Sequence, residues 1–581
     1  MKKNLVLVFT CLSINFLSSQ SPKEFLTVFE KSEGKETGTY SEVIRFYKNL
    51  SATYPEISMQ EMGLTDSGLP LHMVVFNTDT YFDFSEIKKS KRILLINNGI
   101  HPGESDGIDA TMMLFRDLAQ GTIKMPKHTV LVTIPIYNIG GSLNRNSGTR
   151  ANQNGPKAYG FRGNARNYDL NRDFIKCDTD NAKSFAQIFH LVQPDVFIDN
   201  HVSNGADYQY TLTHLFTQHN KLGGTLGEYL NQEMMPLLEK KLADKEWDIT
   251  PYVNVFNQVP EVGFSQFMDY PRYSTGYTAL WNVLGMMVET HMLKPYKQRV
   301  EGTYELMISM LEIIEENHEK IALLRKSSFY NFKEGIAYPL DWQIDTTRIS
   351  TLKFKGFEGK MITSEITGSQ RLKYDRDKPF TKDVIYQNYF KPSVEVTVPK
   401  AYLIPQGWHD VIDLLKRNKV QMERFEKDTT LTVESYKISG FETRKSAYEG
   451  HYPHYNTTIT TSDEQVSLRK GDYVVKTNQP AIRYLLETLE PQAPDSFFNW
   501  NFFDTILQQK EGFSPYVFED TAKNMLENNP ELKATFEEKK ASDASFSTNW
   551  YAQLDWLYEQ SIHAEKAYRQ YPIYRIKNIS E

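Results

Sequence analysis

The stretch RILLINNGIHPGE, residues 92–104, decides the fold and points to the chemistry. Its first part, Arg92–Asn97, encloses a run of branched apolar residues and predicts a buried strand. Its last part places His101 and Glu104 three residues apart, just after that strand. Because a segment this short can bring two ligands to one ion, the stretch predicts a buried strand whose carboxyl end carries part of a metal site.

The sequence on both sides of this stretch alternates between strands and helices. Further strands are predicted at 69–76, 129–136, 195–199 and 286–289, and helices at 40–54, 107–119, 181–191 and 299–324. Asp66-Ser67-Gly68 marks a tight hairpin turn before strand 69–76. Continuous apolar strands that alternate with helices are typical of a mostly parallel sheet covered on both faces. The predicted fold class is therefore α/β, a mixed, mostly parallel twisted sheet flanked by helices.

The composition bounds the class of protein. The chain has 581 residues, 40% hydrophobic and 24% charged, as in an ordinary globular protein. It carries 66 Lys and Arg residues against 73 Asp and Glu, a formal net charge of −7, and no basic stripe. Nucleic-acid binding needs clustered cations that neutralise phosphates, so no nucleic-acid partner is expected.

A chain this long requires more than one core. We predict an α/β catalytic domain at residues 21–328, because its last helical pattern ends near residue 324. Residues 329–480 are rich in Thr, Ser, Val, Tyr and Lys with short alternating runs, which predicts a β-rich accessory domain with one helix near 410–419. Residues 481–581 return to helical spacing and predict a helical C-terminal region, with helices near 480–489, 521–526 and 549–571.

The first twenty residues differ in kind from the rest. Lys2 and Lys3 precede an apolar stretch at 5–17 that is too short to span a bilayer, and small residues follow it. This order is typical of a cleavable signal peptide, residues 1–20, and predicts a secreted or periplasmic protein without a membrane span. Cys177 would be the only cysteine of the mature chain, so no internal disulfide is expected.

Three further polar motifs lie near the predicted strand ends. Asp169-Leu-Asn-Arg172 lies between the second and third buried strands, His201 follows the third, and Glu289 ends the strand at 286–289. In a parallel sheet, ligands bind beyond the carboxyl ends of the strands. A catalytic zinc needs about three protein ligands and one open position, and His101, Glu104 and His201 provide such a set.

The remaining polar residues suggest an amide hydrolase. A carboxylate after three apolar residues is partly buried, so the pKa of Glu289 should rise and make it a proton acceptor near neutral pH. Arg172 offers a planar fork for a carboxylate, with further donors from Asn171, although a solvated polar loop is an equal alternative for this pair alone. Asp169 could accept the second ring proton of His101. An arginine in the loop that follows the second strand could stabilise an oxyanion; its candidates are Arg145, Arg150, Arg162 and Arg166.

Residues 38 to about 326 resemble the zinc metallocarboxypeptidases, the family of the digestive carboxypeptidases and their secreted bacterial relatives. The motifs that carry the resemblance are His101-Pro-Gly-Glu104, Asn138 with its arginine-rich loop, Asp169-Leu-Asn-Arg172, His201 and Glu289, in the family's order. The resemblance implies that His101, Glu104 and His201 hold one Zn²⁺. It also implies that Glu289 activates water and that Asn171 and Arg172 grip the terminal carboxylate of the substrate.

The resemblance leaves two assignments open. The arginine that polarises the scissile carbonyl corresponds best to Arg162, with Arg150 and then Arg145 as alternatives. The family's active-site tyrosine corresponds best to Tyr273, with Tyr270 and Tyr277 as alternatives. The chain also departs from the digestive members, because Gly103 stands where they carry an arginine.

The predicted function is hydrolysis of a C-terminal amide bond by a secreted zinc-dependent carboxypeptidase. Its partner would be a peptide with a free C-terminal carboxylate, and the oligomeric state is left open. Two alternatives remain: a zinc amidohydrolase that cuts peptidoglycan peptides or N-acyl amino acids, and a non-catalytic binding protein.

Overall fold

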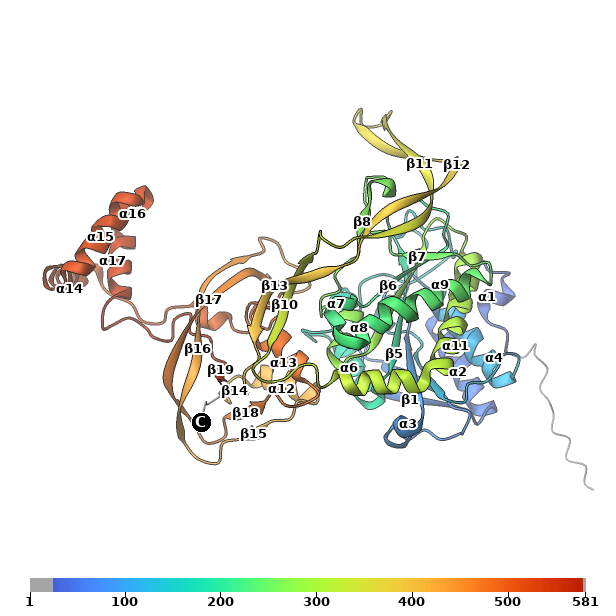
Figure 1. Ribbon diagram of the computed structural model, residues 1–581, viewed down its shortest axis with the longest axis horizontal. Coiled ribbons are helices and arrows are strands. Elements are labelled where there is room, and N and C mark those ends of the chain that lie inside the picture. Colours follow the sequence, from blue (N-terminus) through green and yellow to red (C-terminus); the bar gives the residue numbers. More distant parts are fainter. Residues whose placement is uncertain (1–24, 578–581) are drawn as a thin grey trace, which may run out of the picture.

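The computed structural model describes residues 25–577 and shows an α/β domain, a β-rich region beside it and a group of helices at the far end (Figure 1). The predicted signal peptide, residues 1–20, lies outside the described residues. Among the described residues, no helix is long and apolar enough to cross a membrane.

The α/β domain contains one eight-stranded mixed sheet in the order β1-β2-β4-β3-β5-β9-β6-β7. Its strands are β1 (Ile57–Leu64), β2 (Pro70–Phe76), β3 (Arg92–Asn97), β4 (Thr129–Ile134), β5 (Val196–Ser203), β6 (Leu212–Phe216), β7 (Ile249–Pro251) and β9 (Leu284–His291). The central strands β4, β3, β5 and β9 run parallel, and β1 and β2 form the predicted antiparallel hairpin. The predicted fold class is confirmed.

Helices cover both faces of this sheet, which explains why its central strands are buried and mostly apolar. Along β3, Leu94 and Ile96 point to one face, and Ile93 and Leu95 point to the other. The first face packs against helices that include α2 (Tyr40–Thr53), α4 (Asp106–Gln120), α8 (Gly224–Tyr229), α9 (Met235–Ala243) and α11 (Tyr296–Ser328). The second face packs against α3 (Phe84–Ser90), α6 (Asp180–Val192) and α10 (Ser274–Thr278).

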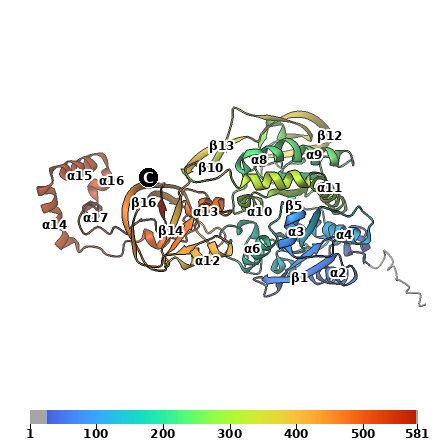
Figure 2. The same cartoon turned by 60° about the horizontal axis from the view of Figure 1, so that its bottom comes forward.

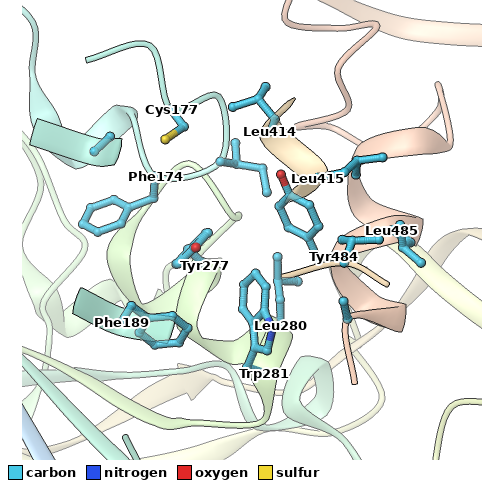
Figure 3. Close-up of a cluster of buried hydrophobic side chains, with 14 of the residues drawn as sticks. Phe174, Cys177, Phe189, Tyr277, Leu280, Trp281, Leu414, Leu415, Tyr484 and Leu485 are labelled. Carbon is cyan, nitrogen blue, oxygen red and sulfur yellow. The ribbon is translucent and has the colours of Figure 1, made fainter. Parts of the chain in front are cut away.

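The core on the second face continues without a break into the β-rich region. Tyr277 and Trp281 of the α/β domain lie beside Leu415 and Tyr484 from the other side (Figure 3). Tyr484 belongs to α13 (Ile482–Leu489), so this part of the predicted helical C-terminal region packs within the shared core. The two regions therefore share one hydrophobic core, in agreement with their close packing in Figure 2.

The β-rich region contains a six-stranded sheet in the order β15-β18-β14-β19-β16-β17. Its elements are β14 (Ala401–Ile404), α12 (His409–Arg417), β15 (Glu423–Arg424), β16 (Thr429–Thr443), β17 (His454–Leu468), β18 (Tyr473–Lys476) and β19 (Tyr574–Ile576). The predicted helix over 549–571 is wrong beyond its first part. Helix α17 (Trp550–Glu559) ends early, and the chain returns through turns to add β19 to this sheet.

Two segments do not follow the predicted division of the chain into consecutive domains. The long hairpin of β11 (Ser350–Thr363) and β12 (Gln370–Gln387) pairs with β8 (Phe264–Ser265) of the α/β domain, although its sequence falls within 329–480. Strands β10 (Ala337–Ile344) and β13 (Phe390–Thr397) connect it to the β-rich region. Helices α14 (Pro515–Asn528), α15 (Pro530–Ser542), α16 (Ala544–Thr548) and α17 form a separate small core.

Candidate active site

The candidate site is a cavity at the carboxyl ends of the central strands. The register of β5 and β9 places His201 beside Glu289, and His101 lies in the loop after β3, on the other side of β5. The cavity has a volume of about 410 Å³. It is lined by His101, Glu104, Arg162, Asn171, Arg172, His201, Val202, Asn204, Leu215, Tyr252, Asn254, Phe256, Phe267, Tyr273, Met287 and Glu289.

Three buried side chains in this cavity converge as metal ligands would. His101 Nδ1 lies 3.2 Å from Glu104 Oε1, and His201 Nδ1 lies 3.1 Å from Glu104 Oε2. The ligand atoms of His101, Glu104 and His201 all lie within 4.8 Å of one another. Within residues 25–577, this is the one such group of three or more His, Cys, Asp or Glu residues. Two ligands on a tetrahedral zinc are about 3.3 Å apart, and the buried Nδ1 of His101 has no hydrogen-bond partner. The residues therefore fit a zinc ion.

The outer nitrogen of each imidazole contacts an aspartate. His101 Nε2 lies 2.9 Å from Oδ1 of Asp169, the residue predicted to accept its second ring proton, and His201 Nε2 lies 3.0 Å from Asp199 Oδ2. Proton donation from His101 Nε2 to Asp169 leaves its Nδ1 free to bind a metal. Asp199 was missed from the sequence. A signal was present, because Asp199 precedes His201 by two residues on one strand and so shares its face.

The two glutamates of the cavity have opposite electrostatic environments. Burial disfavours the charge of Glu104, but the imidazole of His101 and the guanidinium of Arg150 lower its pKa well below the ordinary value. Burial raises the pKa of Glu289 to about 7; His201 opposes this shift and Glu104 adds to it. Glu104 is therefore a permanent anion suited to a cation, and Glu289 can accept and release a proton near neutral pH.

The arginine candidates separate clearly in space. Arg162 lines the cavity, where its Nε and Nη2 lie 3.0 and 2.9 Å from Asp169 Oδ2. Arg150 does not line the cavity; its Nη2 lies 2.9 Å from Glu104 Oε1. Arg145 donates to the carbonyl of Thr37 at 2.7 Å, away from the cavity. The first choice from the sequence, Arg162, is the one of these three that reaches the cavity.

Arg150 also explains why position 103 is a glycine. A Cβ at Gly103 would lie 2.6 Å from Cδ of Arg150 and 3.1 Å from the carbonyl oxygen of Gly160. The side chain of Arg150 therefore crosses the space above Gly103 to reach Glu104. An arginine at position 103 would require the side chain of Arg150 to move.

The predicted carboxylate clamp also faces the cavity. Asn171 and Arg172 both line it, and the guanidinium carbon of Arg172 lies 4.6 Å from the ring centre of Tyr273. The two alternative tyrosines are engaged elsewhere. The Tyr270 hydroxyl donates to Asp341 at 2.7 Å, and the Tyr277 hydroxyl donates to Asn418 at 2.6 Å.

The rest of the cavity wall is neutral and was not found from the sequence. Met287 precedes Glu289 by two residues on β9, and the register pairs it with Leu215 of β6. Tyr252, Phe256 and Phe267 come from irregular loops with no recognisable pattern. His291, which shares the strand with Glu289, does not line the cavity; its Nε2 lies 3.2 Å from Asp207 Oδ1.

The fold and the site together define a metal-dependent hydrolase. Residues 43–195 match the family model of the zinc carboxypeptidases. Carboxypeptidase 2 of Trichophyton rubrum is 21% identical over 425 residues, which cover 69% of this chain and 72% of the relative. Carboxypeptidase 2 of Trichophyton tonsurans is 22% identical over 481 residues, which cover 76% and 81%. These matches confirm the predicted resemblance to the zinc carboxypeptidases, which the family model places within the α/β domain.

Solved structures resemble about half of the chain. A metallo-carboxypeptidase from Burkholderia cenocepacia has 16% identity and a TM-score of 0.35 and covers 48% of this chain and 69% of its own. Carboxypeptidase A from Helicoverpa armigera has 13% identity and a TM-score of 0.36 and covers 48% and 74%.

Proposed function

We propose that the protein is a secreted carboxypeptidase that holds one zinc ion per chain and removes the C-terminal residue of peptides with a free carboxylate. The observation that carries this proposal is the presence of the ligand group, Glu289 and Arg172 in one cavity. Secretion follows from the predicted removal of residues 1–20.

His101, Glu104 and His201 would hold the zinc ion, with Asp169 and Asp199 orienting the two imidazoles. Zinc, when bound, polarises a carbonyl and lowers the pKa of water. Glu289, whose pKa is raised to about 7, would accept the proton of the attacking water and deliver it to the departing amine.

The cations of the cavity would act on the two ends of the scissile segment. Arg162, held by Asp169, would donate hydrogen bonds to the oxyanion that develops on the carbonyl. Arg172 and Asn171 would bind the terminal carboxylate, which places the last amide bond of the chain at the metal. This clamp favours an exopeptidase over an enzyme that cuts inside peptides.

The test uses the full zinc-loaded chain and the substitution Glu289→Gln. Loss of the proton acceptor should lower kcat on a peptide with a free carboxylate by about 10²–10⁴-fold, while zinc content and melting temperature stay unchanged. The matched control is Glu301→Gln, an exposed carboxylate on α11. The same peptide with an amidated C-terminus should be a poor substrate. An active Glu289→Gln enzyme, or equal cleavage of both peptides, would overturn the proposal.

A further inference from the structure

A loop of the β-rich region lies against the predicted substrate clamp. It joins β16 to β17 and spans residues 444–453. The backbone N–H of Asp169 donates to Glu449 Oε2 at 2.8 Å. Further along the loop, His451 Nε2 lies 2.8 Å from Asp178 Oδ2. The loop thus contacts both ends of the segment from Asp169 to Asp178.

The shape of this loop is specific to the contact. Glu449 and Gly450 adopt left-handed conformations, with φ of 50° and 82°. A Cβ at Gly450 would lie 2.5 Å from the hydroxyl of Tyr168, so only glycine allows this close approach. The ring of Tyr448 is stacked on that of Trp500, at 6.0 Å between ring centres. The backbone conformation and the aromatic stack both hold Glu449 in place.

The β-rich region packs tightly against the α/β domain, so its loop can hold the turn at Asp169 in a fixed position. Arg483 of α13 is buried and donates to the carbonyl oxygens of Ala279 at 2.8 Å and Lys221 at 2.7 Å, both in the α/β domain. Its neighbours Tyr484 and Leu485 lie in the shared hydrophobic core (Figure 3). Closely packed interiors of this kind are rigid, so the position of one region is fixed relative to the other.

We propose that Glu449 is a positioning residue for substrate binding, and that the β-rich region thereby completes the substrate-binding half of the active site. Glu449 accepts the N–H of Asp169, and Asp169 begins the short helical turn that contains Asn171 and Arg172. Without the acceptor, this N–H loses its partner in a partly buried position, and the turn loses one of the contacts that orient it. Arg172 would then no longer meet the substrate carboxylate at the required angle.

The inference rests on the proposed function, because it assumes that Arg172 binds the carboxylate of a peptide. It predicts an effect on binding more than on chemistry. The carboxylate of Asp169 keeps its separate contacts with His101 and Arg162, so the zinc ligands should stay in place. A role limited to joining the two regions would change the stability and leave substrate affinity unaltered.

The experiment compares Glu449→Ala with Glu449→Gln in the full zinc-loaded chain. Glutamine keeps an oxygen that can accept the Asp169 N–H, and alanine does not. Glu449→Ala should raise KM for a peptide with a free carboxylate about tenfold, with kcat within about twofold of the parent and zinc content unchanged. Glu449→Gln should restore KM to within about threefold of the parent.

A second measurement separates this inference from the proposed function. Calorimetry with the Glu289→Gln chain measures the Kd of a peptide that is bound but not cleaved. In the double variant Glu289→Gln/Glu449→Ala, this Kd should rise by the same factor as KM. If the parent enzyme cleaves the peptide and Glu449→Ala keeps the parent KM and Kd, the inference is overturned. If the parent neither cleaves nor binds any peptide with a free carboxylate, the proposed function fails instead. Equal KM increases in the alanine and glutamine variants would also overturn the role of the hydrogen bond.

Discussion

The contact between Asp199 and His201 gives the sharpest prediction about the metal site. Asp199 is fully buried; its Oδ2 lies 3.0 Å from His201 Nε2, and its Oδ1 accepts from Asn97 at 3.2 Å. The substitution Asp199→Asn keeps the volume but removes the negative charge that orients the imidazole and makes it a better ligand. Outer carboxylates of this kind typically change metal affinity 10–100-fold, so zinc affinity should fall by that factor, about 1.4–2.8 kcal/mol.

Competition with a chromophoric zinc chelator at pH 7.5 measures this loss directly. The chain offers a matched control in Asp207, which pairs with His291 at 3.2 Å but lies outside the ligand group. Asp207→Asn should keep the parent zinc affinity, although it also loses a contact with Arg376. The reasoning is refuted if folded Asp199→Asn protein binds zinc within about threefold of the parent. It is also refuted if both variants lose zinc affinity equally, because the loss would then not depend on the contact with His201.

Two further predictions concern stability and specificity. Burial lowers the pKa of His190 to about 4 from an ordinary 6.5, so the unfolded chain binds a proton first and stability falls as the pH drops below 6.5. The loss should reach about 2 kcal/mol at pH 5 by urea unfolding and shrink in His190→Gln; a pH-independent parent would contradict it. Because Met287 and Leu215 form an apolar part of the cavity wall, the ratio of kcat/KM should favour peptides ending in phenylalanine over lysine. Met287→Glu should reduce that ratio at least about tenfold, and a parent that prefers lysine would contradict the assignment.

The parts of the fold that the sequence predicted are those fixed by local pattern. Between Arg92 and Asn97, every residue of β3 is apolar because helices cover both faces of the sheet, and this pattern can be read directly from the sequence. The long β11–β12 hairpin was assigned to the β-rich region because composition carries no information about which partner a strand will choose. Its pairing with β8 is a contact between distant segments. The same limit applies to β19, whose three residues join the sheet only after a helical detour.

The candidate site likewise has a part that the sequence could predict, at the strand ends, and a part that depends on loops. His201 and Glu289 lie at strand ends, where sheet topology brings them together whatever the loops do, so their meeting was predictable from the order of strands. Binding of the substrate depends on loops, and a loop takes its conformation from whatever packs against it. The turn at Asn171 and Arg172 contacts Tyr273 from one side, while Glu449 of the β-rich region holds the N–H of Asp169, where that turn begins. With the roles proposed above for Arg172 and Glu449, changes in the β-rich region should alter substrate binding while the metal ligands and the proton acceptor stay in place.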